Sequence, residues 1–487
     1  MQPATRRGVA YKWVALSNTT LGTLMAALDT NIVIIALPTI GRQLAGTTPL
    51  DILWILLGYA LVTSVVLLSF GRLSDQFGRT RMYTTGFAVF TVASLLCSLS
   101  QTGLELVLFR MVQAIGAGFL FANSAAILTD AFPPHERGRA LGVNQIAIVA
   151  GAVSGLLLGG VLTGTLGWRS IFYVNVPIGI FATLWAHYRL RELAELDRVQ
   201  HIDWAGNLTF GGGLASLLAG ITFDALGVIG FVPFLGLVVL GTALLVGFVV
   251  IERRTRYPLF DLSLFRIPTF TGTNVAILLN SIARGAFAFM IVFYLQGPPR
   301  FLGPLTAGLF MVPVSASLAV FGPISGTLSD RYGSRPFAVA GLIISAIGFF
   351  LLTMVGPATT FWGLLVPFVL VGSGFGIFAS PNRAAMMSSV PARRRGVAAG
   401  TGTTLMNAGQ TVSLGVAVLV ISRTLPPSSL GAIFTGKLGA IPPDFRVADF
   451  MSGIHLVFLI SAILMLAAVV PSVLRPPSAG PAPPATR

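Results

Sequence analysis

A single carboxylate lies deep within an apolar stretch near the start of the chain. Asp29 stands in the sequence LDTNIVIIALP (28–38), whereas the other fifteen acidic residues fall between apolar stretches or near their ends. An aspartate at mid-membrane costs about 2.5–3.5 kcal/mol on insertion scales. In a partly desolvated cavity a carboxyl group can take and lose a proton near neutral pH. Asp29 is therefore a candidate for proton or cation handling; the alternative is a structural aspartate paired with a neighbouring helix.

Two arginines also lie inside apolar stretches. Arg110 follows a short connection into its stretch, which places it in the outer half of the membrane, as we expect for Asp29. A buried charge needs a partner or a water-filled cavity, so we predict a functional Arg110 rather than a side chain that snorkels to the surface. Arg284 lies near the middle of a later stretch. Two interpretations of Arg284 stay open: contact with a substrate or with Asp29, and snorkelling or pairing with a distant carboxylate.

Polar amide side chains interrupt several other apolar stretches. Each is costly when it faces lipid, so most should face a cavity or another helix. Any one of them is more often structural than ligand-binding. Together with Arg284, they are the candidate lining of a substrate cavity: Asn144, Gln145, Gln296, Asn407 and Gln410.

A connection rich in glycine and charge occurs twice in the sequence. The first copy is GRLSDQFGRTR (71–81), and GTLSDRYG (326–333) repeats its first eight positions. Glycines permit a tight turn, and a cluster of Asp and Arg can hold one conformation and break in another. We predict a latch of this kind rather than an ordinary polar loop, and a weaker one in the second copy, where Ser334 replaces an arginine. The predicted latch residues are Gly71, Asp75, Gly78 and Arg79, with Arg81 nearby, and Asp330 and Arg331 in the second copy.

Three glycines recur at every fourth position of one apolar stretch. Gly151, Gly155 and Gly159 in GAVSGLLLGG (151–160) share one helix face. Small residues let a neighbouring helix approach closely. The spacing fits a rocking interface between two halves of the molecule and static packing equally well.

The composition requires the apolar stretches to be membrane-spanning helices. The chain has 487 residues, of which 54% are hydrophobic and 10% charged, against about 25% charged in soluble domains. A helix needs about 20 apolar residues to cross the hydrocarbon core. The sequence therefore predicts an all-α polytopic membrane protein with fourteen spans, at 13–37, 50–70, 82–101, 104–128, 139–163, 168–189, 205–224, 229–251, 270–294, 303–325, 337–356, 361–382, 397–422 and 452–474.

Basic residues concentrate on one side of these spans. If both termini are cytoplasmic, the cytoplasmic segments hold 23 Lys and Arg residues and the external segments hold 6. This asymmetry predicts cytoplasmic termini and accounts for the net charge of +15 without nucleic acid as a partner. The single cysteine, Cys97, leaves no intramolecular disulfide, and the sequence contains no Cys/His cluster for a metal.

The repeat divides the predicted spans into two halves. The two latch sequences lie 255 residues apart, which covers eight predicted spans. Both copies therefore enter the membrane from the same side, as in transporters built from parallel halves. We predict a 6+2+6 arrangement: a six-helix half at 1–200, two extra helices with flanking loops at 201–265, a second six-helix half at 266–475 and a disordered tail at 476–487.

The sequence resembles the fourteen-span drug:proton antiporters of the major facilitator superfamily. The resemblance covers nearly the whole chain and rests on LDTNIVIIALP, GRLSDQFGRTR, the region around Arg110, the span-five glycines and, most specifically, GWRSIFYVNVPIG (167–179). It implies that Asp29 is the membrane acid of the first span, Arg110 the arginine of the fourth span, and Asp75 with Arg79 the cytoplasmic latch. The chain departs from the family at Leu156, which replaces a proline and predicts a straighter fifth span.

The resemblance implies a function in transport. We expect a monomeric, multi-pass protein of a bacterial cytoplasmic membrane that exports amphipathic drugs or other small molecules in exchange for protons, by alternating access. The proton gradient would supply the energy, with no cofactor, and no ATPase or hydrolase constellation marks the chain as an enzyme. One deep acid against two deep arginines keeps neutral, zwitterionic and anionic substrates open. The alternatives are a carrier of an endogenous metabolite or lipid, and a non-transporting receptor on a transporter scaffold.

Overall fold

The protein is a bundle of membrane-spanning helices. The computed structural model describes residues 11–133, 136–193, 203–255, 258–298, 300–391, 394–437, 443 and 445–476, and their regular structure is entirely helical. Within these ranges, fourteen helical segments are long and apolar enough to cross a membrane. The predicted all-α architecture with fourteen spans is confirmed. In lipid every backbone N–H and C=O needs an internal partner, and a helix supplies one within the same segment. The predicted disordered tail lies, except for Pro476, outside the described residues.

The chain order of the helices follows the predicted spans. The first six spans are α1 (Tyr11–Gln43), α2 (Pro49–Phe77), α3 (Arg79–Leu99), α4 (Gly103–Ala131), α5 (Arg137–Thr165), and α6 (Ser170–Tyr173) with α7 (Asn175–Arg189). The next two are α8 (Trp204–Ala225) and α9 (Phe231–Arg254). After the 3₁₀ helix η1 (Leu262–Arg266) come α10 (Pro268–Arg284) with α11 (Phe287–Gln296), α12 (Pro304–Tyr332), α13 (Ser334–Leu352), α14 (Phe361–Ser388), α15 (Arg395–Ile421), the short α16 (Pro427–Phe434) and α17 (Val447–Leu474).

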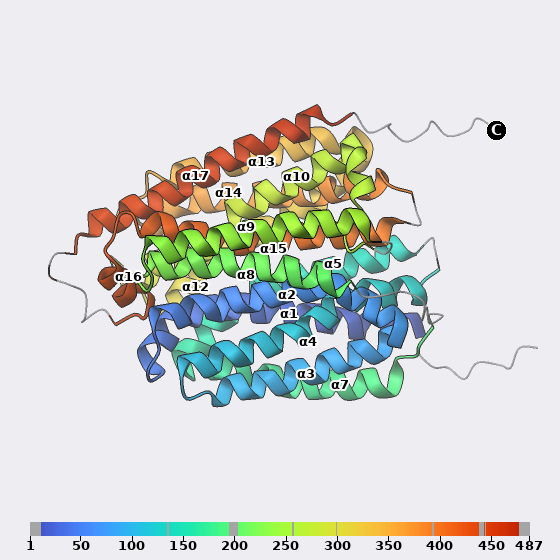
Figure 1. Cartoon of the computed structure of the whole chain (residues 1–487), viewed down its shortest axis with the longest axis horizontal. Helices are drawn as coiled ribbons and strands as arrows, with labels where there is room; N and C mark the ends of the chain where they lie inside the picture. Colours follow the sequence, from blue (N-terminus) through green and yellow to red (C-terminus); the bar gives the residue numbers. More distant parts are fainter. Residues whose placement is uncertain are drawn as a thin grey trace, which may run out of the picture.

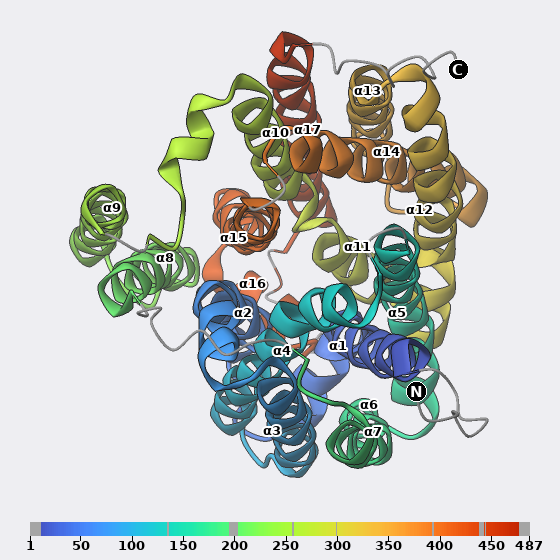
Figure 2. The ribbon, with the colours of Figure 1, turned by 90° about the vertical axis from the view of Figure 1, so that its right-hand side faces the viewer.

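The spans run side by side through one bundle (Figure 1). The start of α1 and the end of α17 lie on the same side of the bundle, which we call the terminal side. Seen from that side, α1, α4, α5, α11, α14 and α15 surround the middle of the molecule (Figure 2). The pair α8 and α9 lies at the edge, where α8 contacts α2 and α15. α8 and α9 therefore flank the other twelve described spans without entering their centre.

The first six and last six spans meet on the side opposite the termini. α5 and α12 are packed so closely there that a Cβ on Gly160 would lie 2.7 Å from the carbonyl oxygen of Pro304. Nearby, the side chain of Gln296 in α11 donates a hydrogen bond to the carbonyl oxygen of Ile35 in α1 at 2.9 Å. These backbone-level contacts close the bundle on the opposite side.

The terminal side is more open. A Cβ added at Gly138 or Gly142 of α5, or at Gly400 of α15, would meet no atom within 4 Å. Both helices begin on the terminal side, so the two sets of spans diverge there. The structure thus represents one state of a molecule that is closed at one end and open at the other.

The ninth span is broken, although the sequence predicted a continuous helix over 270–294. α10 ends at Arg284 and α11 begins at Phe287. Between them, Gly285 lies so close to α15 that a Cβ would come within 2.7 Å of the backbone of Gln410. The hydroxyl of Ser413 accepts a hydrogen bond from the backbone N–H of Ala286 at 2.9 Å. A side chain from a neighbouring helix thus stabilises the break, as membrane helices require.

Candidate functional site

Asp29 and Arg110 form an ion pair inside the first six spans. Oδ2 of Asp29 in α1 lies 2.5 Å from Nη1 of Arg110 in α4, and both side chains are completely buried. Arg110 therefore does not snorkel to the surface. Two charges withdrawn from water are stable only when close, well-placed partners replace the lost hydration. The pair is thus a built feature of the protein interior.

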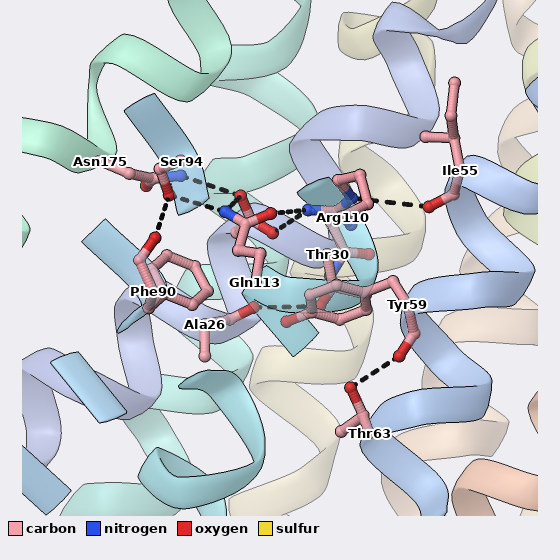
Figure 3. A network of polar contacts seen from close by, with 12 residues as sticks. Ala26, Thr30, Ile55, Tyr59, Thr63, Phe90, Ser94, Arg110, Gln113 and Asn175 are labelled. Atoms are coloured by element: carbon pink, nitrogen blue, oxygen red, sulfur yellow. Dashed lines mark hydrogen bonds and ion pairs between the residues drawn. The ribbon is translucent and has the colours of Figure 1, made fainter. Parts of the chain in front are cut away.

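Two amide side chains complete the surroundings of the carboxylate. Gln113 donates a hydrogen bond to Oδ1 of Asp29 at 3.0 Å, and Asn175 donates another at 2.9 Å. Figure 3 shows Arg110 and Gln113, both from α4, together with Asn175 from α7. All three partners are donors, which suits an ionised carboxylate. A protonated Asp29 would lose the ion pair. Its O–H would also be a donor surrounded by the donor groups of these three partners. Protonation must therefore rearrange this network.

The network extends to two further helices. The ring of Tyr59 in α2 lies beneath Arg110, with the guanidinium carbon 4.1 Å from the ring centroid. Ser94 in α3 accepts a hydrogen bond from Gln113 at 2.7 Å. Nη2 of Arg110 is buried without a hydrogen-bond partner. Helices α1, α2, α3, α4 and α7 thus meet at one charge pair, so a change at Asp29 reaches much of the first half.

Sequence reasoning identified the ion pair but did not assign Asn175 or Tyr59 to it. Asn175 lies within GWRSIFYVNVPIG, and an amide in an otherwise apolar span was the available signal. Tyr59 gave no signal, because an aromatic residue in a membrane span is ordinary.

The first latch copy forms ion pairs, but most of it is helix and not the predicted loop. α2 continues through Gly71 and Asp75 to Phe77, and Gly78 alone separates it from α3. This one-residue turn has φ 101, a conformation that favours glycine. Arg79 contacts Asp75 at 2.9 Å and Asp130 at 2.8 Å. Asp130, at the end of α4, was not predicted, and Arg81 forms no ion pair with a described residue.

The second latch copy repeats the backbone without the ion pairs. Gly333, with φ 84, is the single residue between α12 and α13. Asp330 and Arg331 precede it, and both are exposed. Neither forms an ion pair with any residue in the described ranges. In this state the charge cluster belongs to the first half alone.

The glycine face of α5 packs against α1 within the same half. A Cβ on Gly151, Gly155 or Gly159 would lie 2.5, 2.6 or 2.8 Å from the carbonyl oxygens of Leu24, Leu28 and Ile32, respectively. One of our two interpretations required this face to form the contact between halves. It does not, because it packs against α1 of the same half. That contact uses another face of α5, where the carbonyl oxygen of Leu156 would lie 2.8 Å from a Cβ on Gly308 of α12.

Two of the candidate cavity residues hold helices together. Asn144 is buried and accepts a hydrogen bond from the hydroxyl of Thr23 at 2.8 Å, which joins α5 to α1. Gln296 is also buried and joins α11 to α1 through Ile35. Each amide is used in helix packing, which explains its position without a substrate.

The other candidate cavity residues are available for further contacts. Arg284 does not contact Asp29, so the proposed contact between these two residues is wrong. The guanidinium carbon of Arg284 lies 5.1 Å from the ring centroid of Phe375. Gln145 is exposed and accepts a hydrogen bond from Arg383 at 3.1 Å. The predicted twelfth span ends at residue 382, but α14 continues to Ser388 and carries Arg383. Two half-buried side chains on α15 form no hydrogen bond with a described residue: Asn407 and Gln410.

The polar sites described above contain no obvious metal centre. Within the described ranges, no three His, Cys, Asp or Glu side chains converge as metal ligands.

The sequence matches a known family over most of its length. The Major Facilitator Superfamily profile covers residues 19–414. The chain belongs to this superfamily. Its fourteen spans and its fold are those of a membrane transporter.

Several relatives are named for export and drug resistance. The chain is 32% identical to multidrug resistance protein Stp of Mycobacterium tuberculosis, over 85% of this chain and 77% of that protein. It is 27% identical to a tetracenomycin C resistance and export protein of Streptomyces glaucescens, over 94% and 90%. It is also 32% identical to the riboflavin transporter RibZ of Clostridioides difficile, over 79% and 83%. The predicted relationship to multidrug efflux transporters of this superfamily is confirmed.

Solved structures share the fold. A bacterial homolog of the human lysosomal transporter Spinster, in an inward-facing and unoccupied conformation, has a TM-score of 0.68 at 16% identity and covers 96% of this chain and 97% of that one. An auto-inhibited POT family peptide transporter has a TM-score of 0.65 at 17% identity, with 98% and 99% covered. At these identities the likeness establishes architecture and not substrate.

Proposed function

We propose that this transporter exports amphipathic small molecules across the cytoplasmic membrane in exchange for protons, by alternating access. The observation that carries the proposal is the buried carboxylate of Asp29, held by Arg110, Gln113 and Asn175. Among the described residues, the other buried carboxylates, Asp203 and Glu252, lie at helix ends. Asp29 is the acid placed to couple a proton to rearrangement of the first half.

The coupling follows from the hydrogen bonds of Asp29. In the present state the carboxylate is sealed from solvent and saturated with donors. When the opposite side opens, a proton from outside neutralises Asp29 and releases Arg110 from the ion pair. When the terminal side opens again, the proton leaves and the ion pair re-forms. Each of the two charge states of Asp29 thus favours a different arrangement of α1, α4 and α7.

The distribution of basic residues supplies the direction. The positive-inside rule places the terminal side in the cytoplasm, so the present state is open toward the cytoplasm and can receive an intracellular substrate. The Asp75–Arg79–Asp130 cluster then lies at the cytoplasmic surface. Its ion pairs are local to the first half and can stabilise this state over the opposite one.

A second candidate is the carriage of an endogenous metabolite. The relative named as a riboflavin transporter favours it. The interior charges described above do not select a cation. A metabolite carrier and a drug exporter would share the same helices, so the two differ in substrate and in whether protons are coupled.

The test is proton movement driven by substrate in proteoliposomes. Vesicles containing the purified protein and a pH-sensitive dye are exposed to a panel of amphipathic compounds, and the internal pH is recorded. We expect wild type and the exposed control Asp449→Asn to move protons, and Asp29→Asn to lose this exchange. The double variant D29N/R110Q removes both buried charges and replaces the single variant if that one does not fold.

Two outcomes would contradict the proposal. Substrate–proton exchange by Asp29→Asn at the wild-type rate would remove Asp29 from the coupling. Transport that a protonophore leaves unchanged would favour an uncoupled metabolite carrier.

A further inference from the structure

We propose that Arg284 and Arg383 form an anion-binding subsite in the substrate path, and that the exported compound combines an aromatic or apolar body with a carboxylate, sulfonate or phosphate group. The inference rests on the proposed function, because it names the substrate class of the same transporter. It is drawn from the second half of the molecule, whereas the proton coupling is drawn from the first.

Arg284 is a cation inside the bundle without an anionic partner. It lies where the ninth span breaks, at the end of α10, and is half-buried. Among the described residues, its guanidinium lies against the face of Phe375 in α14. It forms no ion pair and no side-chain hydrogen bond with the described residues. A guanidinium has five N–H donors, so Arg284 has unused capacity for an anion.

Arg383 is a second cation on the same path. It lies eight residues after Phe375 on α14, which is about 12 Å further toward the terminal side at 1.5 Å per residue. Its partner is the neutral amide of Gln145, from α5 of the first half. Both side chains are exposed, and they reach across between the two halves on the open side. The charge of Arg383 is therefore uncompensated near the terminal side, where we propose that the substrate enters. The charge of Arg284 is uncompensated deeper in the bundle.

Among the described residues of the second half, no acid offsets these charges. Its described carboxylates are Asp330 and Asp449, which are exposed at the terminal-side end of α12 and in the first turn of α17, respectively. Asp29 in the first half is fully occupied by Arg110, Gln113 and Asn175. The path thus offers two cations and no free carboxylate. Electrostatic complementarity favours an anion there and disfavours a cationic drug.

An aromatic wall beside Arg284 selects the rest of the ligand. The ring of Phe375 packs against Phe349 with centroids 6.0 Å apart, and Phe287 contacts Phe349 at 5.8 Å. Phe349 and Phe287 are buried behind Phe375, which is itself 5% exposed, so a bound anion would pair with the guanidinium while the apolar body contacts Phe375. The free amides of Asn407 and Gln410 on the adjacent α15 can donate to the same group.

The experiment compares two dyes with one xanthene frame and opposite charge. Sulforhodamine B has one net negative charge and rhodamine 6G has one positive charge. Binding of each to the protein in lipid nanodiscs is measured by fluorescence anisotropy. We expect wild type to bind sulforhodamine B more tightly, and Arg284→Gln to weaken that binding about tenfold or more, as loss of a charge-assisted contact does. Arg284→Lys should retain part of the preference, and Arg254→Gln, an exposed control at the end of α9, should bind as wild type.

Three results would overturn the proposal. The first is that wild type fails to bind sulforhodamine B, and the second is that it binds rhodamine 6G equally or more tightly. The third is an unchanged preference for sulforhodamine B in an Arg284→Gln variant whose thermal unfolding shows that it is folded. The assay needs no proton gradient. If Asp29→Asn binds sulforhodamine B but Asp29 proves irrelevant to exchange, the coupling proposal fails while the anion subsite stands. If Arg284→Gln loses the preference but still exchanges another compound for protons, both proposals stand.

Discussion

At the scale of single residues, the energetics of the protein centre on two buried charges. Removing one member of a buried ion pair leaves the other uncompensated and costs about 3–5 kcal/mol. We predict that Arg110→Gln lowers the free energy of unfolding by this amount. The double variant D29N/R110Q should be more stable than the sum of the single losses implies, because it leaves no lone charge. Reversible unfolding in detergent measures all three variants as a double-mutant cycle.

A surface ion pair provides the matched control for this cycle. Lys12 and Glu136 lie 2.6 Å apart but are about one-third exposed. Lys12→Gln should therefore cost no more than about 1 kcal/mol. Additive losses at Asp29 and Arg110 would show that the two charges are not coupled, against the geometry described here.

The same residues show what sequence reasoning can reach. Asp29 and Arg110 were identifiable because a charge in an apolar span is rare and expensive. Their partners were less visible: Asn175 is neutral, and Asp130 lies near a predicted span end. Arg383 was missed because the apolar run stops just before it while the helix continues to Ser388. A residue type indicates a site when burying that side chain in a membrane span costs much free energy. It indicates little when the free-energy cost of burial is small.

At the scale of helices, the contact between α1 and α5 depends on glycine. A Cβ on Gly155 would lie 2.6 Å from the carbonyl oxygen of Leu28, the residue before Asp29. Because backbone atoms cannot rotate away, Gly155→Ala must push the two helices apart. We predict a loss of about 1–3 kcal/mol in unfolding free energy, as for other overpacked sites, together with slower substrate exchange.

Gly142→Ala is the control on the same helix. A Cβ there meets no atom within 4 Å, and alanine is more favourable than glycine within a helix by about 0.5–1 kcal/mol. Thermal unfolding should therefore show opposite shifts for the two variants. Equal shifts would mean that α1 and α5 are less tightly packed than the structure indicates.

Helices were predicted well in number and less well in their ends and interruptions. Length and hydropathy determine how many segments cross a membrane, because lipid excludes unpaired backbone. They do not show that α2 continues to Phe77 through the predicted loop, since polar helix ends resemble loops in composition. Nor do they show the break after Arg284, which depends on Ser413 from another helix. The boundaries of the two halves near 200 and 266 stay a prediction.

At the scale of the whole molecule, the two halves divide the work that we propose. The first half contains the charge pair that responds to protons, and the second half contains the arginines that would bind the substrate. Most of their contacts run through α5 and α12 and through α2 and α15, and at the proposed anion subsite Arg383 also reaches Gln145 of the first half. Proton and substrate would therefore act on one another through the movement of the halves and not by direct contact, which permits an exchange in which the two need not be bound together.

This division has a measurable electrical consequence. If a monovalent anion leaves the cell while one proton enters, each cycle moves two charges in the direction that an inside-negative potential favours. At about 2.3 kcal/mol per charge per 100 mV, the potential would contribute about 4.6 kcal/mol per 100 mV. A neutral substrate would gain half of this, and a monovalent cation exchanged for one proton would gain nothing.

Efflux of sulforhodamine B from proteoliposomes should thus accelerate as valinomycin and potassium set the interior more negative, with both sides at one pH. Riboflavin, which is uncharged, should respond about half as steeply if it is a substrate. Efflux of sulforhodamine B that is indifferent to the potential would mean that cations leave with the anion and cancel the charge that is moved. A response only half as steep as expected would mean that the anion leaves without proton exchange. Either result would contradict the coupling of one anion to one proton.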